Sequence, residues 1–108
     1  MTGARFDVFK GLDGKYYFDL RAANGEIVLQ SQGYSTKTSA NSGVTSVKIN
    51  GINAARFEVR TAADSSTYFV LKAANGAVIG VSQMYGTSAA ANDGIQSMIS
   101  TVSGIVSK

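Results

Sequence analysis

The 108-residue sequence contains no cysteine, histidine, proline or tryptophan. Without cysteine, disulfide bridges, thiolate nucleophiles and cysteine-bound zinc or iron–sulfur sites are excluded. Without histidine, the usual general base and the commonest transition-metal ligand are missing as well. We therefore expect no catalytic residue, no metal site and no cofactor, and the composition argues against an enzyme without excluding one.

Strong charge and long apolar runs are also missing. Ten basic and seven acidic residues give a net charge of +3, and they are spread along the chain without forming a polybasic arm. No apolar run approaches the roughly 20 residues that cross a bilayer. The opening stretch "MTGARFDVFKG" lacks the apolar centre of a secretory signal. We expect a cytoplasmic protein that does not contact membranes.

What the sequence does contain is a repeat. "AANGEIVLQSQGYST" begins at Ala22, and "AANGAVIGVSQMYGT" begins at Ala73. An ungapped alignment of residues 5–53 with residues 56–104 gives 19 identical pairs out of 49. This identity indicates an internal duplication. We expect one domain over residues 1–108, made of two repeats at about 1–53 and 54–108.

Each repeat is expected to form three strands and a helix. In the first, residues 5–10, 15–22 and 26–31 alternate between apolar and polar side chains, as half-buried strands do. Asn24-Gly25 and Asn75-Gly76 predict hairpin turns of type I′, in which both residues have positive φ.

Beyond Ser31 and Ser82 the apolar period changes to that of a helix with one buried stripe. The stripe consists of Ala40, Val44 and Val47 in the first repeat and of Ala91, Ile95, Met98, Val102 and Ile105 in the second. Thr36 and Thr87 are the expected N-caps. Gly43 and Gly94 inside the helices predict a close contact between helix and sheet.

A single βββα unit has a weak core, and two units complete each other. The expected fold is therefore α+β, with two tandem βββα repeats related by a pseudo-twofold axis. An antiparallel sheet would carry two amphipathic helices on one face. The protein would be a monomer with a dimer-like core.

The stretch "YYFDLRAANGEIVLQSQGYSTKTSANSGVTSVKING" resembles the YegP-like family of small bacterial proteins. The shared features are A-x-N-G, S-Q-x-Y and a helix that contains a Gly-Val-x-Ser-Val run, and they extend over both repeats. The second repeat departs from the pattern at Ala77 and Met98. The resemblance implies the duplicated fold, and that single-copy relatives dimerise, but it implies no biochemical activity.

The sheet face away from the helices is the first candidate site. Alternation places on it several basic side chains and two tyrosines: Arg5, Lys15, Tyr17, Arg21, Arg56, Arg60, Tyr68 and Lys72. Aromatic and basic residues on a sheet can stack nucleic-acid bases. Asp7, Asp19 and Glu58 interrupt the patch, so a solvated face with cross-strand ion pairs is preferred. A protein partner or self-association is the next alternative, and nucleic acid is disfavoured.

The repeated Ser-Gln-x-Tyr corner is the second candidate, with Ser31, Gln32, Tyr34, Ser82, Gln83 and Tyr85. These residues would either line a ligand cleft or, as we prefer, satisfy backbone groups and close the core edge. The preferred function is a non-enzymatic binding or protein-interaction module. The alternatives are a binder of, or an enzyme for, a small anionic ligand at the junction of the repeats, and a weak nucleic-acid binder. The sequence names no partner.

Overall fold

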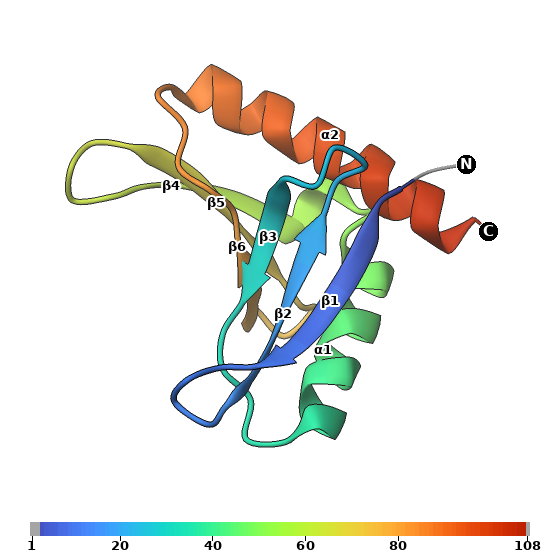
Figure 1. Ribbon diagram of the computed structural model, residues 1–108. Helices are drawn as coiled ribbons and strands as arrows, with labels where there is room; N and C mark the ends of the chain where they lie inside the picture. Colours follow the sequence, from blue (N-terminus) through green and yellow to red (C-terminus); the bar gives the residue numbers. More distant parts are fainter. Residues whose placement is uncertain (1–2, 108) are drawn as a thin grey trace.

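The computed structural model describes residues 3–107. Met1, Thr2 and Lys108 lie outside the described residues, and the first two belong to the opening stretch that lacks the apolar centre of a secretory signal. The chain forms one six-stranded antiparallel sheet and two α-helices (Figure 1). The elements are β1 (Arg5–Lys10), β2 (Tyr16–Arg21), β3 (Ile27–Ser31), α1 (Lys37–Asn50), the 3₁₀ helix η1 (Ala54–Arg56), β4 (Phe57–Thr61), β5 (Thr67–Lys72), β6 (Val78–Val81) and α2 (Ser88–Val106).

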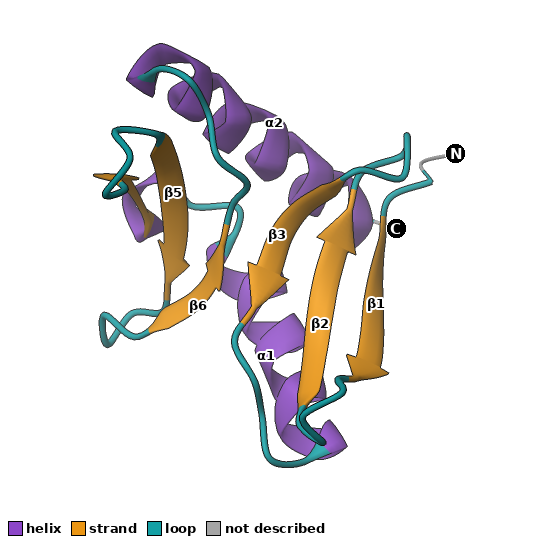
Figure 2. Cartoon of the chain, turned by 60° about the vertical axis from the view of Figure 1, so that its left-hand side comes forward, coloured by secondary structure: helices purple, strands orange, loops and turns teal. Residues whose placement is uncertain are grey.

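The strand order is β1-β2-β3-β6-β5-β4, so the two repeats meet at β3 and β6 in the middle of the sheet. Both helices lie on the same side of the sheet (Figure 2). Helix α1 packs on β1 and β2 and reaches β5 and β6, whereas α2 packs on β4 and β5. The α+β fold of two βββα repeats is thus confirmed, with the opposite side of the sheet left uncovered by helices.

The two repeats share one apolar core between sheet and helices. Its buried members come from both repeats: Phe18, Leu20, Leu29, Val47, Phe69, Leu71, Ile79, Ile95, Met98 and Val102. The predicted stripe of α2 supplies three of them. In α1 the stripe is narrower, because Val44 is only partly buried. Each helix depends on this common core for most of its stability, since short isolated helices are marginal in water.

The pairing of β3 with β6 is short, with only Gln30 opposite Val81 and Ser31 opposite Gly80. Leu29 occupies the space beside Gly80: a Cβ added to Gly80 would lie 2.7 Å from the Leu29 Cδ2 atom. These two residues are equivalent in the repeat alignment. The space between β3 and β6 is therefore filled by one large side chain, Leu29 of the first repeat. The equivalent residue of the second repeat, Gly80, has no side chain and leaves room for it.

The corner after the third strand fixes the distance between helix and sheet. The Tyr34 ring stacks on Phe18, with ring centroids 6.2 Å apart, and the Tyr85 ring stacks on Phe69 at 6.1 Å. A Cβ on Gly43 would lie 2.5 Å from the Tyr34 hydroxyl oxygen, and one on Gly94 would collide with the Tyr85 hydroxyl in the same way. The predicted close contact at both glycines is confirmed.

Both predicted N-caps are present. The Thr36 Oγ1 atom accepts a hydrogen bond from the Ser39 backbone N–H at 3.1 Å, and the Thr87 Oγ1 atom accepts one from Ala90 at 3.0 Å. Each threonine has extended backbone angles. The caps satisfy one free backbone donor at the start of each helix.

The hairpins at Asn24 and Asn75 are confirmed, but their predicted turn type is wrong. Gly25 and Gly76 have φ of 87°, whereas neither asparagine has positive φ. The Gly25 N–H donates to the Ala22 carbonyl, the Ala22 N–H to the Glu26 carbonyl, and the Glu26 N–H to the Asn24 side chain. Each loop is a type I turn followed by one left-handed residue, because the asparagine side chain stabilises the right-handed conformation of its own backbone.

All four hairpins use this loop, and Ser65 holds the left-handed position in one of them, with φ of 73°. We expect Gly25→Val to lower the free energy of unfolding by about 1–3 kcal/mol, because a β-branched residue is strained at positive φ. Ser65→Gly should raise it by about 0.5–1 kcal/mol by relieving the same strain. Urea unfolding measures both, and a change of the same sign at the two positions would contradict the assigned loop.

The shared core makes a second prediction. A fragment of residues 1–53 exposes half of the core and should be unfolded as a monomer, or should dimerise. In such a dimer two copies of Leu29 would compete for the space that Leu29 and Gly80 fill in the whole chain. Circular dichroism and sedimentation measure folding and mass, and a monomeric fragment with cooperative melting would show that each repeat folds alone.

Candidate functional site

The uncovered side of the sheet, here called the open face, has a row of side chains that crosses all six strands. Strand pairing places opposite one another Asp7 on β1, Asp19 on β2, Gln30 on β3, Val81 on β6, Val70 on β5 and Glu58 on β4. The flanking residues of β2 and β5, which include Phe18 and Phe69, face the core. The row is therefore acidic at both ends and differs between the repeats only at its inner positions.

Two basic residues of the first repeat, Arg5 and Arg21, are ion-paired on this face. Asp7 accepts hydrogen bonds from the Nε atoms of Arg5, at 3.2 Å, and Arg21, at 2.9 Å. Arg21 also donates to the Gly25 carbonyl at 2.8 Å. Two guanidinium groups thus share one carboxylate, and Arg21 is held at the edge of the sheet.

The second repeat has a matching cluster around Glu58. Its carboxylate accepts from the Arg60 Nε atom at 2.5 Å and from the Lys72 ammonium at 2.8 Å. Lys72 first, and Arg60 with it, hold the pKa of Glu58 at about 2, so this carboxylate is charged at neutral pH. Four of the six predicted basic residues of the open face are consequently in ion pairs.

Arg56 does not lie on the open face, and its placement there is wrong. Strand β4 begins at Phe57, and Arg56 belongs to η1, the 3₁₀ turn that follows α1. Its Nε atom donates to the Asn50 Oδ1 atom of α1 at 3.2 Å. The alternation of β4 was extended one residue too far, because nothing in the repeat indicates that Asn53 caps a turn at this point.

The two tyrosines lie on the open face as predicted, each half-buried, but in different surroundings. Tyr17 stacks on Phe9, with ring centroids 5.9 Å apart, and its hydroxyl donates to the Asp13 Oδ2 atom at 2.5 Å. This hydrogen bond lowers the pKa of Asp13 and raises the pKa of Tyr17. Tyr68 instead lies opposite Arg60.

Lys15 is exposed in the loop before β2, and its side chain lies beside Gly33 together with Tyr17. Its position in the second repeat is taken by Ser66. The predicted patch is therefore lopsided.

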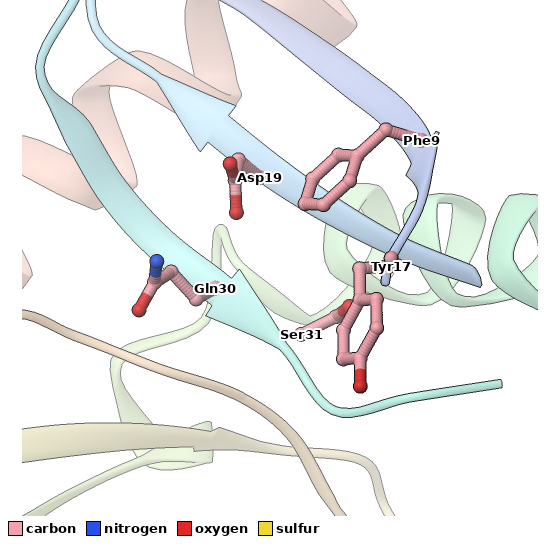
Figure 3. A pocket seen from close by; sticks show the side chains of 6 residues that line it. Phe9, Tyr17, Asp19, Gln30 and Ser31 are labelled. Atoms are coloured by element: carbon pink, nitrogen blue, oxygen red, sulfur yellow. The ribbon is translucent and has the colours of Figure 1, made fainter. Parts of the chain in front are cut away.

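A hollow of about 270 Å³ lies on the first repeat's half of the open face (Figure 3). Its lining comprises Phe9, Gly11, Tyr17, Asp19, Gln30 and Ser31. Asp19 is 7% exposed, and within residues 3–107 neither of its carboxylate oxygens accepts a hydrogen bond. The nearest cation is Arg21, whose Nη2 atom lies 3.9 Å from the Asp19 Oδ2 atom.

The surroundings of Asp19 disfavour its charge. Burial raises the pKa of Asp19, and Arg21 only partly offsets this. In the second repeat Val70 and Val81 occupy the positions of Asp19 and Gln30, so the fold does not require the polar pair. Strand alternation places Asp19 on this face, but Asp19, Phe9 and Gln30 are not among the predicted site residues. The departures from the repeat, at Phe9/Arg60, Asp19/Val70 and Gln30/Val81, were the signal that could have found them.

The two Ser-Gln-x-Tyr corners do not form one cleft. The Ser31 hydroxyl accepts from the Phe18 N–H at 2.8 Å and donates to the Gln32 carbonyl, and Ser82 makes the same pair of bonds with Phe69 and Gln83. In each corner the hydroxyl accepts a backbone N–H of β2 or β5 that would otherwise need a carbonyl partner. The corners therefore satisfy backbone groups, and their tyrosines close the core edge.

The glutamines of the two corners differ. The Gln32 amide donates to the Val78 carbonyl of the other repeat at 2.7 Å. Gln83 and Tyr85 instead line a second hollow of about 360 Å³, larger and more enclosed than the first, between the β2–β3 loop and α2. Glu26 and Asp93 both belong to its lining. This hollow lies at the junction of the repeats and is acidic.

Comparison with known proteins identifies the relatives of this chain. The family described as "Domain of unknown function (DUF1508)" matches residues 12–58 and again residues 62–104. This chain belongs to the DUF1508 family. The UPF0339 protein PA0329 of Pseudomonas aeruginosa is 46% identical over 95 residues, which cover 88% of this chain and 86% of the relative. The UPF0339 protein YegP of Escherichia coli strain K12 is 44% identical over 93 residues, covering 86% and 84%.

Two solved structures have the same fold. The solution NMR structure of yegP from E. coli, a protein of unknown function, superposes with a TM-score of 0.86 at 40% identity and covers 94% of this chain and 88% of its own. The solution NMR structure of the UPF0339 protein SO3888 from Shewanella oneidensis gives 0.83 at 37% identity, with coverages of 93% and 85%. The resemblance to the YegP-like family is confirmed, and both solved relatives share the fold of this chain.

Within residues 3–107, no group of three or more histidine, cysteine, aspartate or glutamate side chains is placed to hold a metal ion. None of the described helices is long and apolar enough to cross a membrane.

The buried carboxylate makes a prediction about stability. Asp19→Val copies the residue of the second repeat and should raise the free energy of unfolding at pH 7 by about 1–2 kcal/mol, because an incompletely paired buried charge is removed. Since the pKa of Asp19 is higher in the folded state than its ordinary value of 3.8, the wild type is penalised above the folded pKa and regains stability as the pH falls. The advantage of the variant should therefore shrink towards pH 3.

Urea unfolding from pH 3 to pH 7 measures this advantage. The matched control is Val70→Asp, which buries a carboxylate at the equivalent position of the second repeat and should destabilise the protein by about 2 kcal/mol or more. An Asp19→Val variant that is less stable than the wild type at pH 7 would show that the carboxylate supports the fold.

Proposed function

We propose that this protein is a non-enzymatic binding module that contacts a protein partner through the open face. The observation that supports this most directly is the distribution of polarity on the face. Val81 and the two half-buried tyrosines lie on its inner strands, whereas Val70 is only 1% exposed and adds no accessible surface. The ion-pair clusters are centred on Asp7 and Glu58 of its edge strands. Accessible tyrosines within a charged rim are a feature of protein–protein interfaces, in which tyrosine is enriched.

Nucleic acid is a weaker candidate for this face. Phosphate binding requires cationic groups that can replace counterions. Here Arg5 and Arg21 already bind Asp7, and Arg60 and Lys72 already bind Glu58. If these groups bound phosphates, their ion pairs with Asp7 and Glu58 would be lost. The tyrosines could stack on bases but carry no charge to bind the phosphates.

A small anionic ligand at the junction of the repeats also has little support. Both hollows carry carboxylates, Asp19 in one and Glu26 with Asp93 in the other. Like charges would repel an anion. If this alternative holds, an anionic metabolite should raise the melting temperature with increasing concentration, as a ligand of the folded state does.

The absence of an enzymatic role is also a proposal and follows from composition: with no histidine and no cysteine, proton transfer would have to rely on carboxylates and lysine. A cytoplasmic location and a single-domain monomer belong to the same proposal.

The open face can be tested by photocrosslinking. Gln30 is exposed at the centre of the open face, and Gln96 is an exposed glutamine on α2. A photoreactive phenylalanine analogue at position 30 should crosslink a defined protein in a lysate of the source organism, and the same analogue at position 96 should not. The crosslinked protein is then purified and its affinity for the unmodified chain is measured. Equal crosslinking at both positions, or no binding between the purified proteins, would contradict the proposal.

The tyrosines provide a variant for the same binding assay. Changing both Tyr17 and Tyr68 to serine should abolish binding to the purified partner and lower the free energy of unfolding by less than about 2 kcal/mol, because both side chains are only partly buried. The control changes the tyrosines of the corners, Tyr34 and Tyr85, which stack on core phenylalanines. That pair should unfold the protein. Severe unfolding by the Tyr17/Tyr68 variant would remove the open face as a site.

A further inference from the structure

The hollow around Asp19 combines three groups that recognise the same chemistry. Asp19 supplies a nine-tenths buried carboxylate without a hydrogen bond from any residue within 3–107. Gln30, directly opposite it on β3, supplies an exposed amide. Phe9 is 43% exposed and supplies the face of an aromatic ring, backed by the ring of Tyr17. Figure 3 shows these side chains around the hollow.

A carboxylate, an amide oxygen and an aromatic face fit a guanidinium group better than other cations. The guanidinium is planar, so it can stack on Phe9 while its N–H groups point along its edge. Its forked donors can reach the Asp19 carboxylate and the Gln30 Oε1 atom together, which a single ammonium does less well. The hollow of about 270 Å³ lies just below the range of about 300–1,000 Å³ that holds whole small molecules, so it suits a side chain.

Arg21, the cation nearest to Asp19, does not form a hydrogen bond with its carboxylate. Arg21 is held by Asp7 through its Nε atom and by the Gly25 carbonyl through its Nη1 atom. Its Nη2 atom remains 3.9 Å from Asp19, beyond hydrogen-bonding distance. The Asp19 carboxylate thus keeps its acceptor capacity for a group that enters from outside.

We propose that the hollow formed by Phe9, Asp19 and Gln30 binds an arginine side chain of the protein partner. This inference rests on the proposed function and specifies what the open face recognises. The second repeat builds the same fold with Arg60, Val70 and Val81 at the three equivalent positions, so these positions are free of the requirements of the fold. Only the half of the face formed by the first repeat has the site.

The probe is the peptide acetyl-Gly-Arg-Gly-amide, titrated into the ¹⁵N-labelled full-length chain. Chemical-shift changes should concentrate at the backbone of Phe9 and Asp19 and at the side-chain amide of Gln30. Peptides with lysine, or with the neutral isostere citrulline, in place of arginine should bind at least about fivefold more weakly, since they lack the fork or the charge. Equal shifts with the lysine peptide would overturn the guanidinium assignment.

Two variants locate the site. Asp19→Asn should weaken binding of the arginine peptide by at least about tenfold, because a charged hydrogen bond is lost. The matched control, Glu58→Gln, removes one carboxylate from the opposite edge of the same face and should change the affinity less than twofold. Equal losses in the two variants would show a general attraction of cations and would overturn the proposal.

The outcome is separable from that of the proposed function. If the arginine peptide fails to bind while a partner still crosslinks at position 30, the open face is the interface and the arginine site is wrong. If neither occurs, both proposals fail.

Discussion

The contact between Leu29 and Gly80 governs how the two repeats are joined. Only two residue pairs connect β3 with β6, so the sheet is continuous. The few backbone hydrogen bonds of this pairing would by themselves hold its centre only weakly. The Leu29 side chain packs into the space left by the glycine and belongs to the core that both helices cover. A second large side chain at this position would overpack the centre of the sheet and force β3 or β6 to shift.

The identical and the divergent positions of the repeat have different roles. Identical residues such as Ser31/Ser82, Tyr34/Tyr85 and Gly43/Gly94 make equivalent contacts in both halves, and each contact satisfies a backbone group or sets a packing distance. The divergent positions of the open face are under no such constraint. The search for function in a duplicated chain is therefore better directed at the differences than at the shared motif.

The sequence predicts the fold well because its constraints are local and occur twice. Strand alternation, the threonine caps and the helical glycines each depend on residues close in the chain, and each is present in the structure. The prediction of the turn type was wrong because Asn-Gly fits two kinds of loop. The hydrogen bond from the Glu26 N–H to the Asn24 side chain decides between them. The candidate site was harder to predict from the sequence, because the ion pair of Arg21 with Asp7 and the burial of Asp19 depend on which strands are neighbours. That information is not contained in any one segment.

Asp19 and Gln30 of the first repeat correspond to Val70 and Val81 of the second. This difference between the halves bears on the stoichiometry of any complex that the open face forms. Two identical chains that assemble through a twofold axis must present every surface feature twice, and would hold two partners or one symmetric partner. A single chain with two unequal halves presents a feature once. If the chain is a monomer that binds the protein partner proposed above through the open face, its unequal halves specify a one-to-one complex in one orientation, on a scaffold that is itself nearly symmetric.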